Sequence, residues 1–102
     1  MGGIRKLRAV RAVVRPTERG QYLESWSRYA ATVQAAGAAV RLLEDQALPG
    51  RFLELTEHTA AEGMESQLES AARQAELRRC CVRREGDDIL YREVRAADLR
   101  SG

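Results

Sequence analysis

The alternation of apolar and polar residues divides the chain into short strands and two amphipathic helices. Leu7 to Arg15 reads LRAVRAVVR, is rich in valine and has no glycine or proline before Pro16, which is typical of a β-strand. Thr17 is suited to the N-cap of a helix, because its side-chain oxygen can accept a hydrogen bond from the first turn. Apolar residues then recur at spacings of four, three and four, which predicts a helix of about five turns. Its buried stripe consists of Tyr22, Trp26, Tyr29 and Val33.

Gly37 is suited to the end of this helix, and two further strand patterns follow it. Residues 38–45 and 51–58 are short and rich in branched apolar side chains, and they flank a loop that contains Pro49 and Gly50. Proline and glycine favour tight turns, so the two runs predict a β-hairpin.

A second helix and a last strand complete the pattern. Thr59 can cap a helix that runs to about residues 79–82. The charged residues of this helix lie on one face, and small apolar residues lie on the opposite face. That inner face consists of Met64, Leu68, Ala71, Ala72 and Ala75. Gly86 and Asp87 mark a turn, and residues 88–94, DILYREV, alternate as a strand.

The order strand, helix, strand, strand, helix, strand predicts the α+β, ferredoxin-like βαββαβ fold. Right-handed crossovers place both helices on one face of a four-stranded antiparallel sheet. The chain is long enough for one domain, residues 1–102, with an ordered core of about residues 6–96 and short tails.

The sheet face without helices carries too many apolar side chains to lie in water. On the third strand, Leu53 and Leu55 alternate with Phe52 and Thr56, so both faces of the strand are partly apolar. A solvated face would show regular alternation of apolar and polar residues. We therefore expect a second copy of the chain to cover this face, which makes the protein a homodimer.

The sequence resembles the dimeric α/β-barrel superfamily over roughly residues 6 to 96, and within it the antibiotic-biosynthesis monooxygenase-like proteins. The resemblance rests on the topology and on four local features. They are the aromatic first helix with Tyr22, Trp26 and Tyr29, the small segment at residues 35–38, Pro49-Gly50 in the hairpin, and Glu57 at the end of the third strand.

The resemblance implies that two sheets pack face to face and that a ligand binds between each sheet and its helices. It implies two alternatives for activity: oxygenation of a planar phenolic or quinol substrate without a cofactor, or a non-catalytic ligand-binding or assembly role. Haem-degrading relatives need an axial histidine in the second helix, and residues 64–75 contain none, with Leu68 in the corresponding place. We therefore expect no haem.

His58 is the only histidine, and its unperturbed pKa suits a general base near neutral pH. In the enzyme hypothesis His58 removes a proton from the substrate and Glu57 orients it, while Tyr22, Trp26 and Tyr29 hold the ring. The alternative is a half-exposed histidine in a turn and an aromatic stripe that is ordinary core. The two descriptions of the stripe are compatible, because Ala30, Ala72 and Ala75 are small enough to leave a cavity between helices and sheet.

Composition excludes several other functions. With 44% hydrophobic and 31% charged residues the chain is a globular one, and a net charge of +2 is too small to indicate a nucleic-acid partner. RNA-recognition domains of this topology display aromatic residues on the third strand, which here reads RFLELTEH. No apolar run approaches the length of a membrane span. One histidine and two adjacent cysteines do not make a metal site, so we expect no metal.

Cys80 and Cys81 are adjacent and cannot cross-link distant parts of the fold, so we expect a cytoplasmic protein. Nearby arginines, including Arg79 and Arg83, would lower a thiol pKa and favour a reactive thiolate. The alternative is a pair of inert, partly buried thiols at the end of a helix.

Overall fold

The computed structural model describes residues 5–59, 61–86, 91–92 and 94. The chain forms five strands, one 3₁₀ turn and two α-helices over these residues. In order they are β1 (Arg5–Val14), η1 (Pro16–Glu18), α1 (Arg19–Ala35), β2 (Ala39–Glu44), β3 (Arg51–Thr59), α2 (Met64–Gln74), β4 (Cys81–Gly86) and β5 (Tyr91–Arg92). The first three predicted strands, the hairpin and both helices are confirmed.

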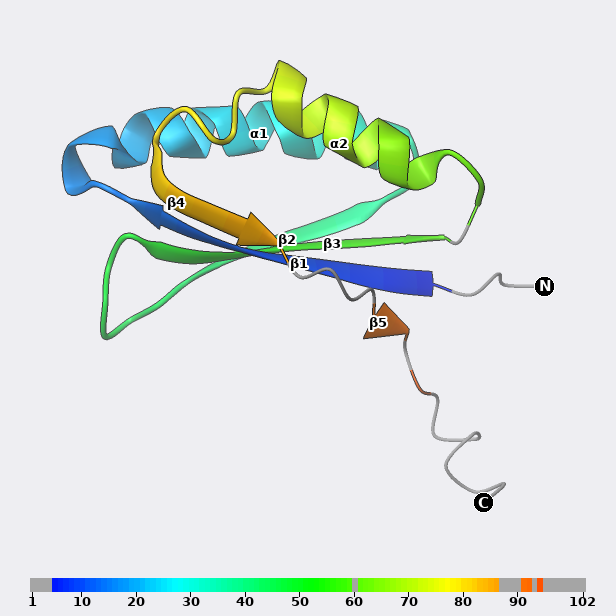
Figure 1. Ribbon diagram of the computed structural model, residues 1–102, viewed down its shortest axis with the longest axis horizontal. Coiled ribbons are helices and arrows are strands. Elements are labelled where there is room, and N and C mark those ends of the chain that lie inside the picture. The colour runs from blue at the N-terminus through cyan, green and yellow to red at the C-terminus, as the bar shows by residue number, and fades with distance from the viewer. Residues whose placement is uncertain (1–4, 60, 87–90, 93, 95–102) are drawn as a thin grey trace.

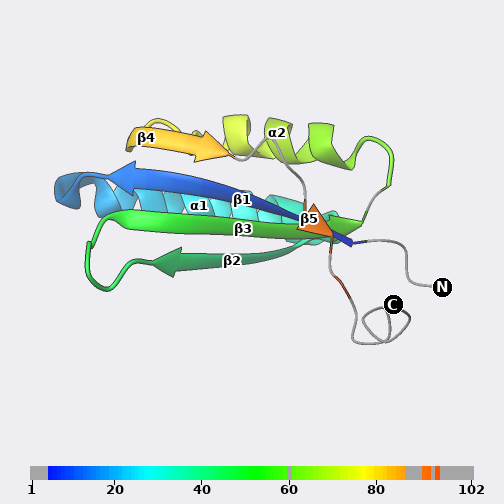
Figure 2. The ribbon, with the colours of Figure 1, turned by 60° about the horizontal axis from the view of Figure 1, so that its bottom comes forward.

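The sheet has the strand order β2-β3-β1-β4, and all its neighbouring strands are antiparallel. The short β5 also pairs with β1. Both helices cover one face of the sheet, and the other face is left open (Figures 1 and 2). The predicted ferredoxin-like fold is therefore confirmed. Within the described residues no helix is long and apolar enough to cross a membrane.

The position of the last strand differs from the prediction. The fourth strand of the main sheet is β4, which pairs with β1. We expected the second helix to end at the residues where β4 begins. Of the predicted strand at residues 88–94, only the two residues of β5 are described as strand. The reason lies in the composition of β4: CVRREG is mostly polar, and its inward-facing Arg84 hides the strand pattern.

The helix starts also differ from the prediction. Thr17 lies in η1, and Glu18 is the N-cap of α1. Thr59 is still part of β3, because it pairs with Arg5 of β1, and α2 begins only after Gly63. Neither threonine is therefore a helix cap.

Gly37 marks the end of α1, as predicted. The N–H groups of Gly37 and Ala38 donate to the carbonyl oxygens of Gln34 and Val33 at 3.0 and 2.9 Å. Gly37 has φ +98°, a left-handed conformation that favours glycine.

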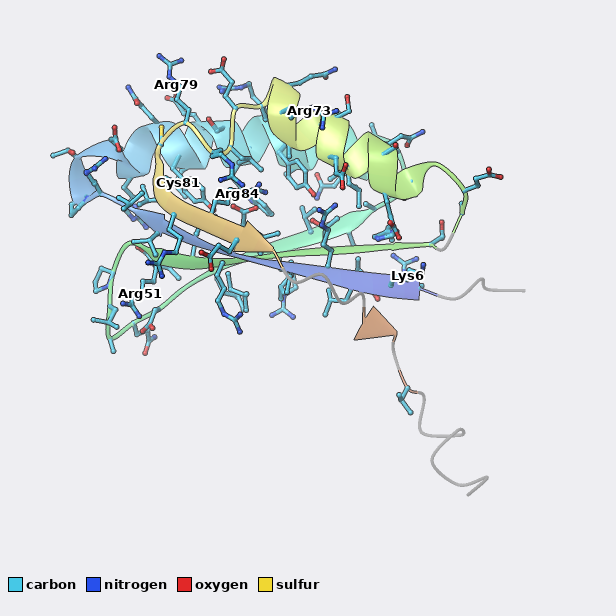
Figure 3. All side chains as sticks on the ribbon, in the orientation of Figure 1. Lys6, Arg51, Arg73, Arg79, Cys81 and Arg84 are labelled. Carbon is cyan, nitrogen blue, oxygen red and sulfur yellow. The ribbon has the colours of Figure 1, made fainter. Side chains whose placement is uncertain are left out.

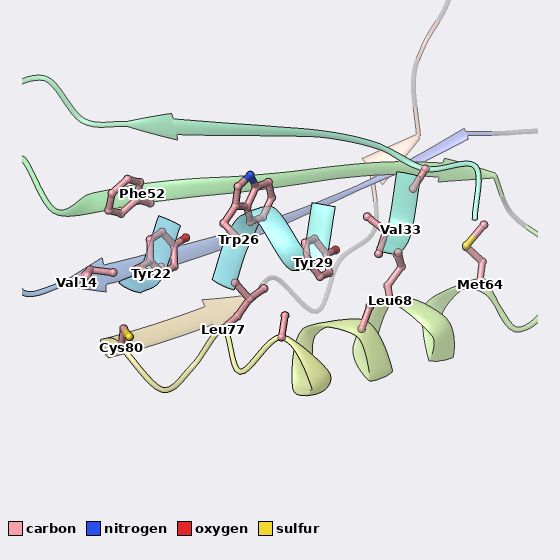
Figure 4. Close-up of a cluster of buried hydrophobic side chains, with 14 residues drawn as sticks. Val14, Tyr22, Trp26, Tyr29, Val33, Phe52, Met64, Leu68, Leu77 and Cys80 are labelled. Atoms are coloured by element: carbon pink, nitrogen blue, oxygen red, sulfur yellow. The ribbon is translucent and has the colours of Figure 1, made fainter. Parts of the chain in front are cut away.

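A buried hydrophobic cluster fills the layer between helices and sheet (Figure 4). Tyr22, Trp26 and Tyr29 all lie inside it, with ring centroids 4.7 Å apart for Tyr22 and Phe52 and 5.2 Å apart for Trp26 and Tyr29. The aromatic stripe predicted from the helical period is thus part of the core, and it anchors α1 on the sheet.

On the central strands, even-numbered residues face the helices and odd-numbered residues face the open side. The burial of β3 alternates along its length, with Phe52 and Glu54 buried and Leu53 and Leu55 only half-buried. The same parity holds in β1. The open face of the two central strands therefore carries the apolar residues Leu7, Ala9, Val13, Leu53 and Leu55, together with Arg5, Arg11, Arg51 and Glu57.

Candidate functional site

The face of β3 that points to the helices is unusually polar. After Phe52 it presents Glu54, Thr56 and His58, which are 2, 4 and 1% exposed. Burying a polar group is costly unless it has a hydrogen-bond partner, and burying a charge requires an opposite charge. The partners of these three side chains therefore define the chemistry of the layer.

Glu54 is held by an ion pair and by a tyrosine. Arg84 of β4 donates from Nη2 and Nε to the two carboxylate oxygens, at 2.8 and 3.2 Å. The hydroxyl of Tyr22 donates to Oε2 at 2.7 Å. This charge-assisted network links α1, β3 and β4 in the interior of the domain.

The ion pair fixes the charge states of its neighbours. Burial alone would lower the pKa of Arg84, but the hydrogen bonds and negative charge of Glu54 raise it, so the guanidinium stays charged. Burial, followed by the Glu54 charge, raises the pKa of Tyr22 well above its ordinary value. Tyr22 is therefore a hydrogen-bond donor at any physiological pH and not a base.

Thr56 forms a second polar contact with α1. Its Oγ1 lies 2.7 Å from the hydroxyl oxygen of Tyr29. Burial raises the pKa of Tyr29, which keeps this phenol protonated too. Two hydroxyl groups that share one hydrogen bond retain one further proton to donate.

A cavity of about 530 Å³ lies between α2, the segment after it, and the sheet. Its floor includes Glu54, Thr56 and Tyr29, and Arg84 enters it from β4 (Figure 3). The rest of the lining consists of Arg8, Val10, Leu68, Glu69, Ala72, Arg73, Glu76, Leu77, Arg78, Arg79 and Gly86. Ala72 is one of the small residues from which a cavity was expected. The volume lies within the range of small-molecule sites, about 300–1,000 Å³.

Only one member of the predicted ring-holding set reaches this cavity. Among the described lining residues that member is Tyr29. Trp26 packs on Tyr29, and Tyr22 acts through its hydrogen bond to Glu54.

The structure does not bring His58 and Glu57 together. Neighbouring residues of a strand point to opposite faces, so Glu57 lies on the open side, where its Oε1 is 3.3 Å from Nε of Arg5. His58 is buried, in contrast to the half-exposed turn residue of the alternative hypothesis. It lines a separate hollow of about 290 Å³ with Lys6 and Glu65, near the start of α2.

The tautomer of His58 follows from its hydrogen bond. Nδ1 is 2.7 Å from the carbonyl oxygen of Thr59, and a carbonyl only accepts, so Nδ1 carries the proton. In the neutral ring Nε2 is then an acceptor, and it is buried with no partner among the described residues.

Cys81 fits the description of an inert, partly buried thiol. Burial, and then the charge of Glu54, raise the pKa of Cys81 to about 11 despite the neighbouring arginines. Its Sγ donates to the carbonyl oxygen of Leu77 at 3.1 Å. Because thiolate is the reactive form, Cys81 is a poor nucleophile at neutral pH. The described residues contain no group of three or more histidine, cysteine, aspartate or glutamate side chains that could hold a metal.

Two solved structures share this architecture over nearly their whole length. A "putative antibiotic biosynthesis monooxygenase" from Nitrosomonas europaea aligns with a TM-score of 0.72 and 14% identity over 94% of this chain and 96% of that one. A protein of the same description from Bordetella bronchiseptica aligns with a TM-score of 0.64 and 13% identity, over 91% of this chain and 98% of its own. The chain has the fold of these two proteins. The fold-level resemblance inferred from the sequence is confirmed. No protein-family model and no curated protein matches the sequence.

Sequence reasoning missed the residues that give this cavity its polar lining. Glu54, Thr56 and Arg84 were not among the candidates, although they form its floor with Tyr29. A signal was present in RFLELTEH: three polar residues share the parity of Phe52, while both leucines have the opposite parity.

Proposed function

We propose that this protein binds a small planar phenolic or quinol molecule in the cavity between α2 and the sheet. The observation that carries the proposal is the reversed polarity of β3. This strand turns Glu54 and Thr56 toward the buried layer and Leu53 and Leu55 toward the open side. A layer selected only for stability would bury the leucines, because buried polar groups contribute little net stability even when paired. Polar groups retained around a cavity support a role in recognition.

The lining suits a ring that carries a hydroxyl group. Leu68, Ala72 and Leu77 offer an apolar wall on the side of α2. The Thr56 and Tyr29 hydroxyls on the floor have hydrogen-bonding capacity left for a phenolic oxygen. A flat ring that carries a hydroxyl group can contact the apolar wall and form a hydrogen bond with the polar floor at the same time.

Filling the cavity is expected to weaken binding. We expect naphthol to quench the fluorescence of Trp26, the only tryptophan, in a saturable manner, because Trp26 packs on Tyr29 of the cavity floor. Ala72→Phe places a ring in the cavity and is expected to weaken binding about tenfold or more, since the ligand and the side chain compete for one volume. Ala31→Phe, on the exposed side of α1, is the matched control. Absence of saturable quenching in the unmodified protein would contradict the proposal.

Oxygenation of the bound ring is a second candidate, favoured by the excess of arginine over glutamate in the cavity lining. A fixed positive charge stabilises a phenolate, and an electron-rich phenolate can give electrons directly to oxygen. When a ring C–H of a phenol becomes the second C=O of a quinone with one O₂, the C–H and O–H hydrogens leave as one H₂O, so atoms and electrons balance without a further reductant.

An oxygen electrode separates the two candidates. Oxygen uptake with a panel of phenols and hydroquinones that Ala72→Phe abolishes supports catalysis in the cavity. Saturable binding without oxygen uptake supports a binding role alone. His58→Ala tests the base predicted from the sequence: because His58 lies outside the cavity lining, we expect the rate to be unchanged.

We also propose that the open sheet face is the interface of a homodimer. Its central apolar residues come from β1 and β3, and Leu43 of β2 extends them with 42% of its surface exposed. Burying such a face is favourable by about 25 cal/mol per Å² of apolar surface. A second copy offers the same face, so a twofold axis pairs leucine with leucine.

A charge in the middle of this face will separate the subunits. Light scattering is expected to give twice the chain mass of 11.4 kDa for the unmodified protein. Leu55→Arg is expected to give the mass of one chain, because two uncompensated charges would be buried across the twofold axis. Ala31→Arg on the exposed side of α1 should leave the mass doubled. A single-chain mass for the unmodified protein at micromolar concentration would overturn the interface.

A further inference from the structure

The cavity lining carries more positive than negative charge. Five arginines and three glutamates contribute to it, a formal excess of two positive charges. Each glutamate is already paired with one arginine. The pairs are Arg84 with Glu54 at 2.8 Å, Arg79 with Glu76 at 3.1 Å, and Arg8 with Glu69 at 3.6 Å.

Arg73 and Arg78 are the arginines that remain. Neither has a carboxylate partner among the residues that the structure describes. Arg73 lies in the last turn of α2, and Arg78 lies in the segment between α2 and β4. Figure 3 shows Arg73 and Arg79 above Arg84, on the helix side of the sheet. Arg73 and Arg78 are both exposed, so the unpaired charge lies on the outer rim of the cavity, whereas the pair of Arg84 and Glu54 lies at its floor.

The backbone between these two arginines is strained. The N–H groups of Glu76 and Leu77 close the end of α2 on the carbonyl oxygens of Arg73 and Ala72, at 3.0 and 3.2 Å. Glu76 adopts φ +56° there, in the left-handed region where α1 uses Gly37 for the same motif. A glutamate is less favourable than glycine in this conformation. The turn places buried Leu77 in the cavity wall and Arg78 on the rim, and such outliers concentrate at ligand sites.

We propose that the ligand of this cavity is an aromatic acid, whose carboxylate is bound at the rim by Arg73 and Arg78 while its ring occupies the apolar wall. This inference rests on the proposed binding function and specifies its ligand class. The planar guanidinium matches a carboxylate with two parallel hydrogen bonds. The formal excess of two positive charges in the lining more than balances the single negative charge of a carboxylate, so the acid meets no net repulsion there.

Calorimetric titration with a matched pair of probes tests the ligand class. The probes are naphthol, which is neutral at pH 7, and a hydroxynaphthoate, which adds only the carboxylate. We expect the unmodified protein to bind the hydroxynaphthoate about tenfold or more tightly, because a charge-assisted bidentate contact is one of the stronger polar interactions. Added salt should weaken binding of the acid and leave naphthol unaffected, because the rim is open to solvent.

Substitution of the two rim arginines tests the assignment of residues. The double variant Arg73→Gln, Arg78→Gln is expected to bind the acid only as well as naphthol, with naphthol affinity unchanged. Both positions are exposed, so the fold should tolerate the change. The double variant Arg15→Gln, Arg28→Gln, at two exposed arginines outside the cavity lining, removes the same net charge and is the control.

The outcomes separate the two proposals. Equal affinity of the unmodified protein for both probes overturns the proposal that the ligand is an acid, but it leaves the proposal of binding in the cavity intact. A preference for the acid that survives the double variant overturns the assignment to Arg73 and Arg78. If neither probe binds, the proposed function fails and the acid assignment fails with it.

Discussion

Replacement of Arg84 by methionine is expected to lower the free energy of unfolding by about 3–5 kcal/mol, because it leaves a buried carboxylate without its counter-charge. Glu54 is 2% exposed, and it would keep only the hydrogen bond from Tyr22. Urea unfolding of the variant and of the unmodified protein measures the loss.

Removal of both charges should recover most of this loss. A double variant with methionine at positions 54 and 84 replaces the ion pair with apolar side chains of similar volume, which is often close to neutral for stability. The hydroxyl of Tyr22 then lacks its acceptor, which costs about 1–3 kcal/mol. We therefore expect the double variant to be more stable than Arg84→Met alone. Additive losses in the two single variants and the double variant would show that the ion pair does not act as a unit.

An exposed ion pair provides the matched control. Arg79 and Glu76 are paired at 3.1 Å, but their side chains are 76 and 54% exposed. Such surface pairs contribute between about 0 and 1 kcal/mol. Arg79→Met should therefore change the free energy of unfolding little. A loss as large as that of Arg84→Met would show that burial is not what makes the loss of Arg84 costly.

Hydrophobic period and turn residues were sufficient for most of the fold. The spacing of Tyr22, Trp26, Tyr29 and Val33 located α1, because a helix buries one stripe of its surface. Pro49 and Gly50 located the hairpin, because few residues suit a tight turn. Gly37 located the end of α1 for the same conformational reason.

The site was harder to predict because its residues break those local rules. β4 pairs with β1 as a strand, yet its sequence is charged, since the partner that makes Arg84 acceptable inside is Glu54 on another strand. A contact between two residues that are 30 positions apart produces no periodic pattern in the sequence. His58 was singled out for its chemistry, but no pattern in the sequence indicated that it lies outside the main cavity.

The two faces of β3 connect the cavity with the proposed assembly. A strand with leucine on one parity and polar residues on the other normally buries the leucines against its own helices. Here the helices cover Glu54, Thr56 and His58, while Leu53 and Leu55 face the open side. In the proposed dimer, the ligand cavity would lie inside each subunit, and the contact between subunits would lie on the opposite face of the sheet.

Gly50→Ala is expected to destabilise the protein by more than about 1–3 kcal/mol, the range for a strained backbone conformation alone. Gly50 has φ +94°, and an added Cβ would lie 2.6 Å from the carbonyl oxygen of Val14. This oxygen belongs to the backbone of Val14, and the N–H of Val14 donates to the Gly50 carbonyl oxygen at 2.8 Å. Val14 therefore cannot move without disturbing the pairing of β1 with β3. Urea unfolding at one protein concentration measures the loss.

Two other glycines separate the conformational cost of Gly50→Ala from its steric cost. Gly37 has φ +98° but open space around its Cα, so Gly37→Ala should lose only the conformational part. Gly20 lies in α1 with open space and a helical backbone, so Gly20→Ala should stabilise the protein by about 0.5–1 kcal/mol. The expected order of stability is Gly20→Ala, then the unmodified protein, then Gly37→Ala and last Gly50→Ala. If Gly50→Ala were no worse than Gly37→Ala, the hairpin would have to approach β1 less closely than the structure places it, because the difference between the two variants is the contact with Val14.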